Sequence, residues 1–343
     1  MKFETPKPNQ FYYKLYMFLG MLRHPRRLWN FIKYTLSNFN TSVNYLPTMM
    51  DLEPSQTCNF HCLMCTPFKN KRANMTLEEF KAIVDSQHGL IEIKIQGVGE
   101  PLLNKDFIPM IEYARRKMLW VRTTTNGSLL HLQDNYKRLV NSGVHDINIS
   151  IDGVTKPVYE SIRIGGNYEQ ICTNCRLIND YNSRVRKTVV RAWVLMQKQN
   201  KHQFLEFPEF FAGLGFKEMT ISFAMHNYGR EGDNNEAEDC CFSDQDFEQF
   251  FRSCSQAGIK PSFFFHPRFS AAKFCQIPFK RIYVTTDSHV LPCCYIANQE
   301  VVDFGHYQDF DDIWFRNYTA FRHALKEGKA VPGYCQKCYG GNT

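Results

Sequence analysis

Six short apolar runs alternate with helical patterns from residue 48 onward, and this alternation constrains the fold more than any other feature. The runs that read as buried strands are 48–54, 90–96, 120–126, 145–151, 189–196 and 216–223. The segments between them that read as helices are 76–87, 105–117, 132–143, 168–181 and 202–215. Strands joined by helices form right-handed crossovers and a parallel sheet. We therefore expect an α/β fold, a partial (β/α)6 TIM-like barrel that binds ligands at the carboxyl ends of its strands.

The composition is that of an ordinary globular protein. Of the 343 residues, 43% are hydrophobic and 22% are charged, which is typical of a packed domain and unlike a disordered chain. The formal net charge of +7 is modest for this length, and much of the excess lies within the first 35 residues. Nucleic-acid binding would require a broader basic surface, so we expect no nucleic-acid partner.

Residues 1–45 form a basic N-terminal extension that reads as helical. The stretch 11–36 is rich in aromatic residues and leucine, but Pro25 and a cluster of cations interrupt it. No uninterrupted apolar run is long enough to span a bilayer, and no export signal with a cleavage site is recognisable. We expect two short helices that pack on the main domain, with contact to a membrane surface or a partner protein as the alternative.

Three of the 13 cysteines stand close together after the first predicted strand. In CNFHCLMC (58–65) they are Cys58, Cys62 and Cys65, separated by three and then two residues. Structural zinc normally takes four protein ligands, whereas this loop offers three thiols. Three thiolates around a four-iron cube would leave one iron without a protein ligand, and that iron could bind a small molecule. An iron–sulfur cluster with one open iron is the better expectation for this loop.

A second group of four cysteines lies near the C-terminus. Cys275 and Cys293 flank two predicted strands joined by a turn, and Cys335 and Cys338 follow a helical segment as Cys-x-x-Cys. Four sulfur ligands can hold either zinc or an iron–sulfur cluster, and composition does not distinguish the two. Cys294 is the alternative to Cys293 as a ligand.

The three-cysteine spacing after the first strand resembles the signature of the radical S-adenosylmethionine (radical SAM) superfamily. In that family the open iron binds S-adenosylmethionine, and an electron from the cluster cleaves this cofactor to a 5′-deoxyadenosyl radical. The C-terminal cysteines resemble the twitch domain, a shortened SPASM domain that holds one auxiliary 4Fe-4S cluster. The resemblance implies two 4Fe-4S clusters and S-adenosylmethionine as cofactors. The implied metal ligands are Cys58, Cys62, Cys65, Cys275, Cys293, Cys335 and Cys338.

Further motifs stand where members of this family bind the cofactor. GVGEP (97–101) follows the second strand and is similar to the family's Gly-Gly-Glu motif, in which Glu100 would accept from the cofactor ammonium. TTNG and SIDG end the third and fourth strands, and Arg163 matches a family position near the cofactor carboxylate. The resemblance implies cofactor binding by Gly97, Gly99, Glu100, Pro101, Thr125, Asn126, Ser150, Asp152 and Arg163.

These motifs divide the chain into four predicted segments. Residues 1–45 are the N-terminal helical extension, and residues 46–232 are the radical SAM partial barrel. Residues 233–272 are a barrel-closing helix and connector, and residues 273–343 are a small twitch- or SPASM-like cluster domain.

The resemblance implies that a substrate carbon loses a hydrogen atom, and the later steps stay open. We expect oxidation of a sugar, an aminocyclitol or a similar small polar natural-product intermediate, because a fully cysteine-ligated auxiliary cluster suits electron acceptance. An epimerase with Cys240 or Cys241 as hydrogen donor is one alternative. A maturase of a ribosomally made peptide is another, and it would work with a separate recognition partner. A non-catalytic iron–sulfur or zinc-binding protein is the alternative from a different class.

The expected partners follow from the same resemblance. They are a small polar substrate or a peptide, together with an electron donor of the flavodoxin or ferredoxin type. Because the clusters require reducing conditions and no export signal is visible, the sequence predicts a cytoplasmic location.

Overall fold

A single curved sheet forms the body of the protein. The computed structural model describes residues 10–65, 74–223, 242–264 and 274–336. Within these ranges the strand order is β7-β6-β5-β4-β3-β2-β1-β8-β9. The strands are β1 Met49–Leu52, β2 Glu92–Ile95, β3 Trp120–Thr125, β4 Asp146–Ser150, β5 Val189–Leu195, β6 Glu218–Ser222, β7 Lys260–Phe264, β8 Arg281–Val284 and β9 Val290–Leu291. All neighbouring strands are parallel except β8 and β9.

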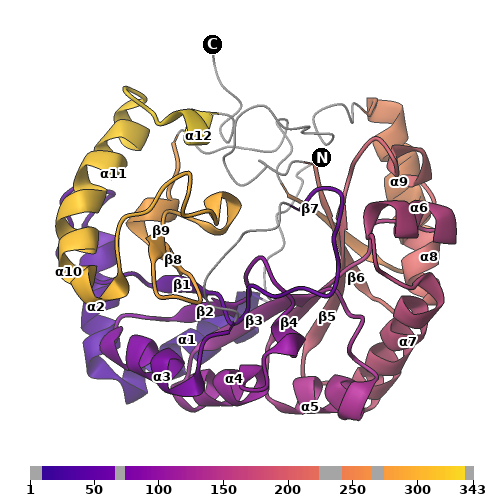
Figure 1. Cartoon of the computed structure of the whole chain (residues 1–343), viewed down its shortest axis with the longest axis horizontal. Coiled ribbons are helices and arrows are strands. Elements are labelled where there is room, and N and C mark those ends of the chain that lie inside the picture. The colour runs from indigo at the N-terminus through magenta and orange to yellow at the C-terminus, as the bar shows by residue number, and fades with distance from the viewer. Residues whose placement is uncertain (1–9, 66–73, 224–241, 265–273, 337–343) are drawn as a thin grey trace.

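Helices cover the outer face of the sheet (Figure 1). Those between the barrel strands are α3 Leu77–Ser86, α4 Phe107–Arg116, α5 Asn135–Asn141, α6 Lys156–Ile162, α7 Tyr168–Val185, α8 Phe207–Gly213 and α9 Asp244–Ala257. The C-terminal helices are α10 Phe310–Asp312, α11 Tyr318–Glu327 and α12 Gly333–Gln336. Helix α3 begins with a capping box, in which Thr76 and Glu79 bond to each other's backbone amides. The mostly parallel α/β sheet confirms the expected fold class.

Three strands, β7, β8 and β9, lie outside the six that the sequence analysis assigned to the barrel. Strand β7 belongs to the segment expected to be a connector, and its sequence KPSFF is a weak strand signal because Pro261 cannot donate to a ladder. Proline is tolerated in a strand at the edge of a sheet, which is where β7 lies. Its pairing with β6 therefore extends the barrel beyond six strands.

Strand β8 comes from the segment predicted to be a separate cluster domain, in which the sequence analysis expected two strands joined by a turn. It pairs in parallel with β1, with Met49 opposite Arg281 and Leu52 opposite Val284. Figure 1 shows β8 and β9 beside β1, with α10 and α11 outside them. The first strand of the C-terminal hairpin thus continues the barrel sheet. The predicted boundaries at 46, 233 and 273 stay predictions.

Charged side chains of opposite sign form a continuous row across seven strands, here called the charge row. In order it runs through Asp51, Arg281, Glu92, Arg122, Asp146, Arg191 and Glu218. Successive nitrogen–oxygen distances are 3.6, 3.6, 3.4, 3.5, 3.3 and 2.6 Å. Most of these side chains are buried, so each charge depends on its neighbours for compensation.

Helices α1 Gln10–Arg23 and α2 Pro25–Leu36 pack at the amino-terminal ends of the strands. The ring of Tyr16 lies 4.7 Å from that of His145 and 6.0 Å from that of Trp120, the first residue of β3. Tyr13 Oη donates a 3.4 Å hydrogen bond to Glu92 in the charge row. Two short helices on the main domain agree with the sequence analysis. Among the described residues, no helix combines the length and apolarity that crossing a bilayer requires.

Candidate cofactor site

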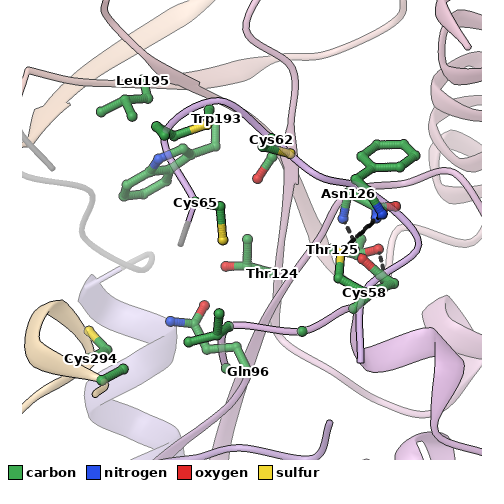
Figure 2. Close-up of a pocket in the computed structure, with 18 of the residues that line it drawn as sticks. Cys58, Cys62, Cys65, Gln96, Thr124, Thr125, Asn126, Trp193, Leu195 and Cys294 are labelled. Carbon is green, nitrogen blue, oxygen red and sulfur yellow. Dashed lines mark hydrogen bonds between the residues drawn. The ribbon is translucent and has the colours of Figure 1, made fainter. Parts of the chain in front are cut away.

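A cavity of ≈250 Å³ opens at the carboxyl ends of the strands. Cys58, Cys62 and Cys65 all line it, together with side chains from β2, β3, β4 and β5. Figure 2 shows the three cysteines on one loop and Cys294, from the C-terminal region, on another side of the same cavity. The loop predicted to hold a cluster therefore lies at the predicted end of the barrel.

The cysteine loop is held in place by the segment that follows α6. The amide of His61 donates to the carbonyl of Ile164 at 2.8 Å, and the amide of Leu63 donates to that of Ile162 at 2.9 Å. Within the loop, the amide of Cys65 donates to the carbonyl of Cys62 at 2.9 Å. These backbone bonds give a short loop a defined path without regular secondary structure.

Arg163 lies between the two backbone contacts of that segment and points at the loop. Its Nη1 is 3.7 Å from Cys62 Sγ, and its Nε donates a 2.6 Å bond to Asp152 Oδ2. Burial alone would lower the pKa of this guanidinium, but Asp152, Cys62 and Tyr159 together outweigh burial and raise it. Asp152 also accepts from the amide of Leu195 at 2.7 Å. The carboxylate therefore fixes a permanent cation beside Cys62.

Glu100 ties the second and third strand ends to the cysteine loop. It is 2% exposed, and it accepts from Thr125 Oγ1 at 2.6 Å, from the Asn126 amide at 2.7 Å and from the Leu102 amide at 3.1 Å. The Asn126 side chain then lies 3.9 Å from Cys58 Sγ. Burial raises the pKa of Glu100, although these three donors stabilise its charged form.

A second buried carboxylate, Glu53, supports the GVGEP turn from beneath. It accepts from the Val98 amide at 2.8 Å and from Tyr283 Oη at 2.9 Å, so it joins β1, β2 and β8. Burial raises its pKa to about 6. A Cβ atom on Gly97 would lie 2.1 Å from Glu53, and one on Gly99 would lie 2.5 Å from the Ser55 carbonyl. Only glycine fits at these two positions.

The structure brings most of the predicted cofactor residues to the cavity and leaves some away from it. The lining includes Gly97, Gly99, Glu100, Thr125, Asn126, Ser150 and Arg163. Pro101 and Asp152 are buried outside the lining, so neither contacts the cavity as the resemblance implied. Asp152 is used instead to orient Arg163. Cys240 and Cys241, the hydrogen-donor candidates, lie outside the described residues, as does Cys338.

Several cavity residues were not found by sequence reasoning. Lys94 and Trp193 line the cavity, and Lys94 Nζ lies 5.9 Å from the Trp193 ring centroid. Cys294, which was expected only as an alternative auxiliary ligand, lines the cavity as well. Burial lowers the pKa of Lys94. The available signal was a polar residue at an inward position of a strand, since Lys94 precedes Gln96, which also lines the cavity, by the strand period of two.

The C-terminal cysteines occupy a second, buried location. Cys275, Cys293 and Cys335 are each at most 9% exposed. Cys293 and Cys335 both lie close enough to Tyr334 for their charges to add to burial in raising the pKa of that phenol to about 12. Cys294 instead lines the cofactor cavity. The side chains of Cys293 and Cys294 therefore lie in different surroundings, and this favours Cys293 as the ligand of the auxiliary cluster.

The donor sets fit iron–sulfur clusters better than single ions. In the ranges 10–65, 74–223, 242–264 and 274–336, no three Cys, His, Asp or Glu side chains converge as they would around one metal ion. In a 4Fe-4S cluster each thiolate binds a different iron, so the sulfur atoms of the ligands lie farther apart than they do around a single ion. Three thiols on one cavity, with a cation beside Cys62 and an amide beside Cys58, suit an anionic cluster with one open iron.

Two family models match the chain. The model described as the radical SAM superfamily matches residues 52–211, and the SPASM model, described as an iron–sulfur cluster-binding domain, matches residues 275–339. The first match contains the CNFHCLMC loop, GVGEP and Arg163. The second contains the four C-terminal cysteines that were predicted as ligands.

Two similar proteins match very different shares of the chain. GTP 3′,8-cyclase of Campylobacter jejuni subsp. doylei is 37% identical over 129 residues, which are 34% of this chain and 37% of the cyclase. The match thus spans little more than a third of that enzyme. The antilisterial bacteriocin subtilosin biosynthesis protein AlbA of Bacillus subtilis is 23% identical over 366 residues, covering 98% of this chain and 77% of AlbA.

A solved structure shares the fold. Streptococcus suis SuiB, bound to the precursor peptide SuiA, superposes with a TM-score of 0.64 at 14% identity, covering 84% of this chain and 69% of SuiB. At this identity the likeness shows a shared architecture and nothing finer.

Proposed function

Since the chain belongs to the radical SAM superfamily and carries a SPASM-type iron–sulfur domain, we propose that it is an enzyme that modifies a peptide by radical chemistry. Its cofactors are a 4Fe-4S cluster and S-adenosylmethionine, with auxiliary iron–sulfur in the C-terminal domain. When bound, these groups supply a radical that removes a hydrogen atom from a substrate carbon.

The alignment with AlbA carries this proposal, because it covers 98% of the chain. AlbA is named for the biosynthesis of a bacteriocin, and SuiB is bound to a precursor peptide. This support favours peptide modification, an alternative in the sequence analysis, over the expected oxidation of a sugar or aminocyclitol. Binding of the peptide by a separate recognition partner belongs to the proposal.

The apolar part of the cavity wall supports the same choice. It includes Trp193, Leu195 and Tyr283, whose rings and methyl groups suit an amino-acid side chain. A polyhydroxylated ring would need a hydrogen-bond partner for each buried hydroxyl, and unpaired ones would cost free energy. Lys94 adds one cationic group to this otherwise largely apolar wall.

We assign proposed roles to the cysteine ligands and to the residues that line the cavity. Cys58, Cys62 and Cys65 hold the catalytic cluster, while Arg163 and Asn126 donate toward its sulfur ligands. Glu100, Thr125 and Ser150 form the cofactor side of the cavity. Cys275, Cys293, Cys335 and Cys338 hold an auxiliary cluster, and a flavodoxin or ferredoxin is the proposed electron donor.

The test compares substrate classes on anaerobically reconstituted enzyme with S-adenosylmethionine and a chemical reductant. Precursor peptides encoded beside the gene form one arm, and aminocyclitols and amino sugars form the other. With the parent enzyme we expect a peptide to stimulate formation of 5′-deoxyadenosine and to change in mass. With the Cys58/Cys62/Cys65→Ala variant we expect no 5′-deoxyadenosine and no change in the mass of the peptide. Stimulation by a sugar or aminocyclitol with no peptide response would overturn the proposal.

A further inference from the structure

Exposed hydrophobic side chains gather on the two N-terminal helices. Within the described residues, ten of the fifteen exposed large hydrophobic side chains belong to α1 and α2. They are Phe11, Tyr12, Leu15, Phe18, Leu19, Leu22, Leu28, Trp29, Ile32 and Leu36, here called the N-terminal apolar surface. Single exposed apolar residues are ordinary, but a concentration on one element marks an interaction surface.

Helix α1 is apolar on two opposite sides. Its inner side holds Tyr16 and Met21, which are buried against the barrel. On its outer side Phe11, Leu15, Phe18 and Leu22 follow one another at helical spacings of four, three and four residues, and Phe18 and Leu22 are 56% and 57% exposed. A helix that is apolar all round is normally buried on every side. The barrel covers one side of α1 and leaves the other for a partner.

The charged residues of the two helices that carry this surface are all cations. Residues 10–36 contain Lys14, Arg23, Arg26, Arg27 and Lys33 and no aspartate or glutamate. Arg27 is turned inward, where it donates to the carbonyls of Lys117 and Met118 at 2.8 and 3.0 Å. Lys14, Arg23 and Arg26 are exposed. Apolar side chains with a tryptophan, bordered by lysine and arginine, are the composition of helices that lie in a bilayer interface.

A hollow beside the bend between α1 and α2 adds a place for an anion. It measures ≈470 Å³, and its lining includes Arg23, His24, Arg26, His88 and Lys117. Burial and, after it, neighbouring cations lower the pKa of both histidines. The lining carboxylate, Asp85, is paired with Lys117 at 2.6 Å. A phosphate group would meet an excess of positive charge in this hollow.

From these observations we infer that the N-terminal apolar surface docks on a bilayer containing anionic phospholipid. The outer sides of α1 and α2 lie among the headgroups and upper acyl chains, and the cations contact lipid phosphates. Tyr13 and Tyr16 hold α1 to the first residues of β2 and β3, whereas the cofactor cavity opens at the opposite strand ends. The docked enzyme therefore keeps its cavity open to water.

Co-sedimentation of the full chain with vesicles tests the inference. We expect binding to vesicles of phosphatidylcholine mixed with phosphatidylglycerol, and much weaker binding to phosphatidylcholine alone. The double variant Phe18→Glu/Leu22→Glu should bind about a hundredfold more weakly, because two large apolar side chains are lost from the interface. Leu132→Glu/Leu205→Glu is the matched control, since both leucines are exposed on other elements, and it should bind as the parent does.

The contribution of charge is measured separately. Arg23→Glu/Arg26→Glu should weaken binding more than about tenfold, at roughly fivefold for each cation removed, and added salt should weaken binding of the parent chain. Circular dichroism checks that each variant is folded. Binding that is unaffected by Phe18→Glu/Leu22→Glu would overturn the inference, and so would failure of the parent to bind anionic vesicles.

The fluorescence of Trp29 reports the contact directly. Trp29 is 61% exposed, whereas Trp120 and Trp314 are buried. Anionic vesicles should shift the emission to shorter wavelength, and Trp29→Phe should abolish the shift. Sedimentation without lipid tests whether a second copy of the chain covers this surface instead. If the chain self-associates through this surface, Phe18→Glu/Leu22→Glu dissociates the oligomer, and that result without vesicle binding contradicts the inference.

Discussion

The barrel interior has two ends that use polar side chains in opposite ways. Toward the amino-terminal ends of the strands, the charge row places each carboxylate beside an arginine. Toward the carboxyl ends, Gln96 and Ser150 instead line a cavity, and Lys94, the register partner of Asp51, lines it as well. Charged groups that pair with one another stabilise the fold. Polar groups that face a cavity keep hydrogen-bonding capacity that a ligand can use. Substitutions at the two ends should therefore separate stability from binding.

The largest change in stability is expected from Asp146→Ala in the charge row. Asp146 is fully buried between Arg122 and Arg191, so its removal leaves buried guanidinium charges without their shared partner. Breaking a buried pair in this way costs about 3 to 5 kcal/mol of the free energy of unfolding. Chemical denaturation measures this. Asp312→Ala, which removes an exposed pair with Arg316, is the control and should cost less than about 1 kcal/mol.

Glu100→Ala should lower both the stability of the fold and the affinity for the cofactor, because Glu100 lines the cavity and also accepts hydrogen bonds from its own chain. Three donors lose their acceptor, which costs about 1 to 3 kcal/mol of the free energy of unfolding. The displaced Thr125 and Asn126 should also weaken binding of S-adenosylmethionine by roughly ten- to a hundredfold. Equilibrium binding to the reconstituted protein measures this effect, with the exposed Glu78→Ala as control. Unchanged cofactor affinity would show that the turn is held without Glu100.

The pH dependence of stability should show the contribution of the raised pKa of Glu53. Its pKa in the folded chain is about 6, above its ordinary value of 4.5, so folding favours the protonated form. Its contribution is fully present below pH 4.5 and is lost as the pH rises through 6, a decrease of about 2 kcal/mol in the free energy of unfolding. Denaturation of the cluster-free chain at several pH values measures the decrease. Glu53→Gln should remove this component of the slope, and a persistent slope would assign it to other groups.

The smallest change in stability is expected from Lys94→Met. Burial already lowers the pKa of Lys94, so its charge stabilises the fold little, and a side chain of similar length should keep the free energy of unfolding within about 1 kcal/mol of the parent. Substrate-stimulated formation of 5′-deoxyadenosine should fall all the same, since the cavity loses its cation. If Lys94→Met unfolds the chain as Asp146→Ala does, the contrast between the two ends of the interior is wrong.

Local patterns were sufficient to predict the barrel and the cysteine loop. The six predicted strands correspond to β1 to β6, because buried parallel strands are continuous apolar runs bounded by turn residues. The helix start at Thr76 followed from a capping box that involves only neighbouring residues. Cys58, Cys62 and Cys65 were found because their spacing is local and their residue type is rarely placed so closely by chance.

Features that depend on residues far apart in the chain were not predictable. The pairing of β8 with β1 joins the two ends of the sequence, and no local pattern indicates which strand a C-terminal hairpin contacts. Asp152 was expected at the cofactor, but its partners are Arg163 and the Leu195 amide, and only the folded sheet brings them together. Lys94 and Trp193 were missed for the same reason, because each shares the cavity with residues from other strands, and Cys294 was expected only at the auxiliary site.

The contact of β8 with β1 also determines when the sheet can be completed during synthesis. Arg281 and Met49 are 232 residues apart, so β1 has a free edge until most of the chain has left the ribosome. Contacts of such separation are formed late, because closing a long loop costs entropy before the contact stabilises it. We expect the cysteine loop, which follows β1, to reach its final position only at this late stage. Fragments that end before β8 should therefore be prone to aggregation through the open edge of β1.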